Sequence, residues 1–111
     1  MAMTLNEYQH LAQRTCNTCG FDKIENGVLG LCGETGECAD ILKKTKYQGH
    51  EFDRFHMAKE LGDVLWYVAE LAEGLGMTLE AIAAINIEKL QDRYPEGFST
   101  ERSLHRQEGD L

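Results

Sequence analysis

The stretch HMAKELGDVLWYVAELAEGLG, residues 56–76, decides the fold of this 111-residue chain. Its apolar side chains recur every three or four positions, which is the period of an α-helix that buries one face. The stripe consists of Met57, Leu61, Val64, Leu65, Val68, Leu71 and Ala72. Asp53 precedes the stretch and Gly74 and Gly76 close it, so we expect one helix between these signals.

Two further helices are predicted ahead of this stretch. Thr4 is followed three residues later by Glu7, a capping box that starts a helix, and we expect that helix to fray near Cys19-Gly20. A second helix is then predicted from about Gly27 to about Lys46, because apolar residues recur on one broad face: Val28, Leu29, Leu31, Cys32, Ala39 and Leu42.

A fourth helix is predicted from Thr78, which can cap it, to Tyr94-Pro95-Glu96-Gly97, where proline cannot continue it. No alternating strand pattern competes, and short connections favour antiparallel neighbours. The expected fold class is all-α: an antiparallel bundle of about four helices in residues 1–98, then a polar, partly disordered tail in residues 99–111. A domain this small buries a modest fraction of its surface, so we expect oligomerisation to complete the bundle.

The formal net charge of -8 argues against a general nucleic-acid or membrane-surface binder, because both need basic patches. We see no apolar run of membrane-spanning length and no signal peptide, so we expect a cytoplasmic protein. Cys16 and Cys19 have zinc-knuckle spacing, but Cys32 and Cys38 are too widely spaced to complete such a site. We therefore expect buried thiols.

Two pairs of acidic residues are the candidate functional groups. Glu34 and Glu37 are three residues apart in the predicted second helix, and Glu60 and Asp63 are three apart in the third. Residues at this spacing project side by side on a helix. If the two helices pack antiparallel, the two pairs can face each other.

The position of these pairs on their helices indicates a metal site. All four acids border the apolar arc, where carboxylates lose hydration and repel one another unless a cation neutralises them. Mg²⁺ or Mn²⁺, which prefer oxygen ligands, are the natural counter-charge, and such ions can hold phosphates and activate water. Acidic pairs at this spacing are also common on solvated helix faces, and the spacing alone leaves that interpretation open.

These motifs carry a family resemblance. Glu-x-x-Glu on one helix and Glu-x-x-Asp on the next resemble the signature of the MazG-like nucleotide pyrophosphohydrolases of the all-α NTP pyrophosphatase superfamily. Three stretches resemble that family in the right order, and the likeness extends from about Leu5 to Phe98: GLCGETGE at 30–37, KELGDVLWY at 59–67, and the segment 86–98.

The resemblance implies hydrolysis between the α- and β-phosphates of a (d)NTP, giving a nucleoside monophosphate and pyrophosphate. It also implies that the four carboxylates bind Mg²⁺, that a metal-bound water attacks, and that the chain forms homodimers or homotetramers. A narrower substrate, such as dCTP, dUTP or phosphoribosyl-ATP, stays open, as does a non-catalytic nucleotide-binding or oligomerisation module. A ferritin-like di-iron site is disfavoured because its Glu-x-x-His pairs are missing.

Basic and polar residues of the last predicted helix form a candidate phosphate-binding edge. Asn86, Lys89 and Arg93 share one stripe, and cations there would offset charge on the leaving pyrophosphate. Lys44 shares a stripe with Glu37 and is a further phosphate candidate. A solvated flank with ion pairs, or a lysine that complements a helix C-terminus, is the alternative in each case.

Four more residues are candidates for supporting roles. His56 shares the stripe of Glu60 and Asp63 and can hydrogen-bond a ligand carboxylate, and Tyr67, one turn after Asp63, can orient it. Trp66 and Phe98 are candidates for contact with a base, or with a partner chain in the case of Trp66. Core packing is the commoner fate of buried aromatic side chains, and it stays open for all three aromatic residues.

Overall fold

A computed structural model describes residues 2–110, which form five helices and no strand. They are α1 (Leu5–Gln13), α2 (Phe21–Tyr47), α3 (Arg54–Gly74), α4 (Leu79–Arg93) and α5 (Thr100–Leu104). The all-α prediction is confirmed, with one helix more than expected. The chain divides into two compact units, the first ending at Leu79 and the second beginning at Glu80. None of the helices in the described part of the chain is long and apolar enough to cross a membrane.

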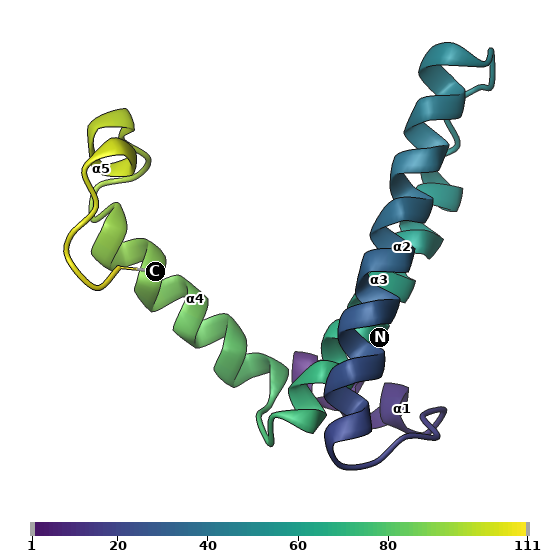
Figure 1. The fold of residues 1–111 in the computed structure, drawn as a ribbon, viewed down its shortest axis with the longest axis horizontal. Helices are drawn as coiled ribbons and strands as arrows, with labels where there is room; N and C mark the ends of the chain where they lie inside the picture. The colour runs from purple at the N-terminus through teal and green to yellow at the C-terminus, as the bar shows by residue number, and fades with distance from the viewer. Residues whose placement is uncertain (1, 111) are drawn as a thin grey trace. The chain divides into compact units, whose positions relative to one another are not determined.

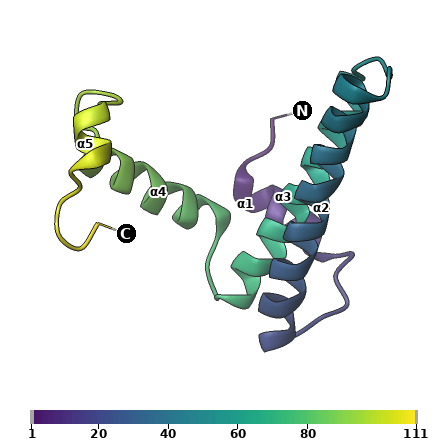
Figure 2. The same cartoon turned by 45° about the horizontal axis from the view of Figure 1, so that its top comes forward.

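Helices α2 and α3 lie side by side and form the frame of the first unit (Figures 1 and 2). Glycines allow the close approach: a Cβ at Gly27 would lie 3.0 Å from Leu71 Cβ, and one at Gly74 would lie 2.8 Å from Ile24 Cγ1. The Tyr67 ring of α3 lies directly on α2 at Gly30. Gly27, predicted as a helix start, is thus a buried packing residue inside α2, which begins at Phe21 after Gly20 (φ 58°).

Helix α1 begins as predicted and ends earlier than predicted. The Glu7 amide donates to Thr4 Oγ1 at 3.0 Å and the Thr4 amide donates to Glu7 Oε1 at 3.3 Å, which confirms the capping box. The helix ends at Gln13 because the side chains that follow it form hydrogen bonds with α3 and not with a continued helix. Cys16 and Thr18, in the connection to α2, donate to the carboxylate of Glu70 on α3.

Glu70 is fully buried, and its carboxylate organises the start of the fold. It accepts from Thr18 Oγ1 at 2.5 Å, from Cys16 Sγ at 3.2 Å and from Asn26 Nδ2 at 2.8 Å. Loss of hydration opposes ionisation, but these hydrogen bonds and the charge of Lys23 outweigh it and lower the pKa of Glu70. One carboxylate thereby joins α3, α2 and the connection between α1 and α2.

Two further side chains attach α1 to α3. The Trp66 indole Nε1 donates to the carbonyl of Ala12 at 3.1 Å and to Thr15 Oγ1 at 3.0 Å. The buried Gln9 donates to Glu73 Oε1 at 3.0 Å and accepts from the Leu79 amide at 2.6 Å. Each satisfies polar groups that would otherwise be costly to bury.

The apolar stripes are less buried than the sequence predicted. Leu61 and Leu65 of the α3 stripe are 56% and 37% exposed, and Leu29 and Leu42 of α2 are 65% and 57% exposed. Among the described residues of the first unit, the buried apolar side chains are Ala69 and Ala72, which are fully enclosed, and Leu79. The prediction of buried cysteines is also wrong: all four thiols are free, and none is fully buried. A hairpin of two long helices covers one face of each helix and leaves the other open.

The second unit contains most of α4, then a turn and α5. Helix α4 ends at Arg93, just before Pro95, as predicted. Tyr94 and Phe98 pack across the turn with ring centroids 5.2 Å apart. The segment expected to be a polar tail contains α5, because the Ser99 side chain accepts from the Arg102 amide and caps it.

A candidate metal centre on the paired helices

Three of the four predicted metal ligands lie together. Glu34 of α2 and Glu60 and Asp63 of α3 each offer a carboxylate oxygen, and these oxygens all lie within 4.8 Å of one another. Glu34 and Glu60 are half-buried and Asp63 is exposed. The side-by-side packing of α2 and α3 is what joins acids that are 26 residues or more apart in sequence.

The electrostatics of Glu34 show that these charges repel one another. Loss of hydration raises its pKa most, followed by a hydrogen bond with Glu60 and repulsion from Asp63, Glu60 and Glu37. A raised carboxyl pKa means that the ionised form is disfavoured at this point. A hard divalent cation would remove that penalty, and three carboxylates fit the oxygen ligands that Mg²⁺ and Mn²⁺ prefer.

Glycines beside the acids leave free space. A Cβ built at Gly33, Gly36 or Gly62 meets no atom within 4 Å, in contrast to the tight contacts at Gly27 and Gly30. Close approach of the two helices therefore accounts for the glycines at 27 and 30, further along the hairpin, and not for those beside the acids. The space next to Glu34 and Asp63 is open to a ligand.

Glu37, the fourth predicted ligand, lies outside the three-carboxylate set and is exposed. It lines a neighbouring cavity of about 300 Å³ together with Lys44 and His56. His56 Nε2 is 3.6 Å from Glu60 Oε1, so this cavity adjoins the carboxylates. Three residues predicted separately from the sequence thus share one hollow beside the acidic cluster.

Asp40 is a residue of this cavity that the sequence reasoning missed. Its carboxylate binds Lys44 Nζ at 3.0 Å and Lys43 Nζ at 3.5 Å. The hydrogen bond from Lys44 is the largest cause of its lowered pKa. The sequence spacing could have identified Asp40, because it follows Glu37 by the same three residues that separate Glu34 and Glu37.

Tyr8 of α1 is a second missed residue. Its pKa is raised by burial and by the negative charge of Asp63. The charge of the exposed member of the acidic cluster therefore acts on a side chain of α1. The sequence holds no signal for this neighbour, because tertiary contacts such as those of Trp66 and Gln9 bring α1 to α3.

The predicted aromatic residues are placed as follows. Tyr67 packs on Gly30, and Trp66 contacts Tyr67 edge-on with centroids 5.0 Å apart while its indole binds α1. In the described residues no hydrogen bond joins Tyr67 to Asp63. Phe98 is 76% exposed in the second unit. Both α3 aromatics therefore serve packing of the first unit.

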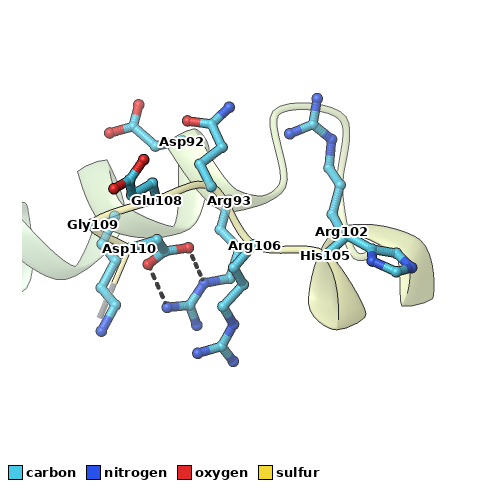
Figure 3. Close-up of a pocket in the computed structure, with 10 residues that line it drawn as sticks. Asp92, Arg93, Arg102, His105, Arg106, Glu108, Gly109 and Asp110 are labelled. Atoms are coloured by element: carbon cyan, nitrogen blue, oxygen red, sulfur yellow. Dashed lines mark hydrogen bonds and ion pairs between the residues drawn. The ribbon is translucent and has the colours of Figure 1, made fainter.

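The candidate phosphate residues Asn86, Lys89 and Arg93 belong to α4. Asn86 and Lys89 are exposed, whereas Arg93 is half-buried and forms an ion pair with Asp110 at 2.7 Å. Lys89 and Arg93 also line a pocket of the second unit (Figure 3).

Comparison with known proteins agrees with this architecture. The family model of the MazG nucleotide pyrophosphohydrolase domain matches residues 23–98, more than half of the chain and all four predicted ligands. Gene 37 protein of Mycobacterium phage L5 is 40% identical over 73 residues, which are 62% of this chain and 64% of that protein, so the chain spans less than two thirds of that relative. No solved structure matches. The match of the family model, on helices that bring the signature acids together, shows that this chain belongs to the MazG nucleotide pyrophosphohydrolase domain family.

Proposed function

We propose that the chain is a Mg²⁺-dependent nucleoside triphosphate pyrophosphohydrolase, which cleaves between the α- and β-phosphates to give a nucleoside monophosphate and pyrophosphate. The observation that carries the proposal is the convergence of Glu34, Glu60 and Asp63 on one spot. Membership of the family supports the reaction class.

The chain's own residues have separable roles in this proposal. Glu34, Glu60 and Asp63 would hold Mg²⁺, or Mn²⁺, and Glu37 would complete the set from the adjoining cavity. When bound, such an ion supplies charge neutralisation and a water of lowered pKa. Lys44, held by Asp40, offers the cavity a positive charge for a phosphate oxygen. His56, beside Glu60, orients that carboxylate.

On α4, Asn86, Lys89 and Arg93 are proposed to contact the phosphates, and the cations among them would offset charge on the leaving pyrophosphate. Four further residues lie outside the three-carboxylate set and are the proposed candidates for supporting the site or contacting the base: His56, Trp66, Tyr67 and Phe98. The preference for a particular base is therefore set by residues other than the carboxylates that would hold the metal.

The deciding experiment is a panel of canonical and modified nucleotides incubated with Mg²⁺, in which pyrophosphate and orthophosphate are measured separately. We expect pyrophosphate without orthophosphate, and no product when the metal is chelated. Turnover of several bases would indicate a broad enzyme. Turnover of only dCTP, dUTP or phosphoribosyl-ATP would indicate a narrow one.

Variants locate the chemistry. Glu60→Gln and Asp63→Asn should lose at least about 100-fold in kcat, since removal of one electrostatic group costs that much in other enzymes. Glu25→Gln, an exposed residue of α2 that touches neither the acids nor the cavity, is the matched control and should keep full activity. Full activity in Asp63→Asn would refute the metal site. An inert wild-type protein with every nucleotide and either metal would favour a non-catalytic module.

A further inference from the structure

The second unit contains a pocket of about 390 Å³ that lies within residues 89–110. Four cationic side chains line it: Lys89 and Arg93 from the end of α4, and Arg102 and Arg106 from α5 and the segment after it. Three carboxylates, those of Asp92, Glu108 and Asp110, also line it, so cations outnumber acids here, whereas the whole chain has 11 Lys and Arg against 19 Asp and Glu. Such a pocket attracts anions in an otherwise acidic protein.

The pocket already holds an anionic group from the chain itself. The Asp110 carboxylate accepts from Arg93 Nε at 2.8 Å and from a terminal guanidinium nitrogen at 2.7 Å (Figure 3). The two side chains are only 11% and 17% exposed. The hydrogen bond with Arg93 is the largest cause of the lowered pKa of Asp110, and the charges of Arg106 and Lys89 add to it.

The arrangement of the other acids leaves this side of the pocket cationic. Figure 3 shows the Arg106 guanidinium extending to the same side as the pair of Arg93 and Asp110. Asp92 and Glu108 point to the other side. Of the carboxylates that line the pocket, Asp110 is the one whose hydrogen bonds to Arg93 are drawn, and it lies on the side to which Arg106 extends.

Asp110 is also held in a way that permits exchange. It lies after Gly109, which has φ 86°, in a turn closed by the Asp110 amide and the Gln107 carbonyl at 3.1 Å. It is not part of a helix, so a few backbone dihedrals can withdraw the carboxylate. The planar fork of a guanidinium binds two oxygens of a phosphate with the same geometry that it uses for a carboxylate.

We propose that this pocket is a binding site for a phosphate group, and that Asp110 occupies it as a tethered competitor that leaves when the phosphate enters. The ligand class is a di- or polyanionic phosphate, either free pyrophosphate or orthophosphate, or the phosphate of a nucleotide. The proposal deepens the proposed function, because Lys89 and Arg93 are its phosphate candidates. Its regulatory element, Asp110, is independent of the carboxylates that would hold metal.

The test is calorimetric titration of inorganic pyrophosphate into the full chain at low ionic strength and without divalent metal. Asp110→Asn should bind about two- to fivefold more tightly than wild type, the range expected when one ion pair no longer competes. Arg106→Gln should bind more weakly while it leaves the pair of Arg93 and Asp110 in place. Glu25→Gln removes one negative charge elsewhere and should bind as wild type does.

Three outcomes would each overturn the proposal. Asp110→Asn could bind pyrophosphate no more tightly than wild type, or Glu25→Gln could tighten binding as much as Asp110→Asn does. The third outcome is that neither wild type nor Asp110→Asn binds pyrophosphate. The Gly109 amide resonance gives a local check in the wild type, because it should shift on addition of pyrophosphate. Titrations with orthophosphate and a nucleoside monophosphate separate the two sources, since tighter binding of the nucleotide identifies it as the ligand. Glu60→Gln should lose hydrolysis and keep pyrophosphate binding, so the two proposals can fail separately.

Discussion

Tyr67 of α3 lies against the backbone of α2 at Gly30, so closely that a methyl group on this glycine would overlap the ring. The contact is the tightest of the glycine positions along the hairpin, and it lies between the Gly27 contact and the acidic cluster. The register of α2 against α3, and hence the meeting of Glu34 with Glu60 and Asp63, depends on it.

Gly30→Ala should therefore destabilise the protein by about 1–3 kcal/mol, the usual cost of overpacking. Gly33→Ala is the matched control, because the space around its Cβ is open. There alanine should be neutral or stabilising by up to about 1 kcal/mol, since it is the better helix former. Chemical denaturation measures both variants, and equal stability of the two would contradict the packing argument.

Glu70→Gln should destabilise the protein by about 1–3 kcal/mol at pH 7, because the amide nitrogen cannot accept from Thr18, Cys16 and Asn26 as the carboxylate does. Glu25→Gln on the exposed face of α2 should change stability little. Urea unfolding of both variants at constant pH provides the comparison.

The same carboxylate predicts a pH dependence. Its pKa in the folded protein lies below the ordinary value of 4.5, so its stabilisation is fully present above pH 4.5 and is lost as the pH falls through the lowered pKa. The difference between wild type and Glu70→Gln should accordingly shrink in acid. A difference that is constant from pH 7 to pH 3 would mean that Glu70 is not the titrating group.

The acidic cluster predicts opposite effects on stability and on metal binding. Because Glu34, Glu60 and Asp63 repel one another, Glu60→Gln should raise the midpoint of thermal unfolding of the metal-free protein. Mg²⁺ should raise the wild-type midpoint through preferential binding to the folded state, and that rise should be smaller in the variant. A variant that is less stable without metal, yet equally responsive to Mg²⁺, would argue for a structural role.

The exposed apolar residues predict self-association. Leu29 and Leu61, expected in the core, are 65% and 56% exposed on α2 and α3, and apolar surface of this kind commonly marks an interface. We expect a homodimer or homotetramer by light scattering. Leu29→Asp should dissociate it, whereas Leu104→Asp on α5, where the leucine is 73% exposed, should not. A monomeric wild type would refute this prediction.

The sequence by itself determined the all-α fold class, three of the helix boundaries and the spacing of the acidic pairs. The capping box at Thr4, the cap at Asp53 and the stop at Pro95 are local signals that act within a few residues, and all three lie where they were predicted. The spacing of the acidic pairs also follows from helical periodicity alone.

Only the tertiary structure decided where α1 ends, which glycines pack and which acids meet. Cys16 and Thr18 leave the helix for Glu70, and Tyr67 occupies the space at Gly30, although each partner is more than 30 residues away in sequence. Glu34 meets Glu60 and Asp63, while Glu37 turns to the cavity of Lys44 and His56. Helical period specifies the direction of a side chain around its own axis, but the register between two helices is set by the contacts that they make with each other.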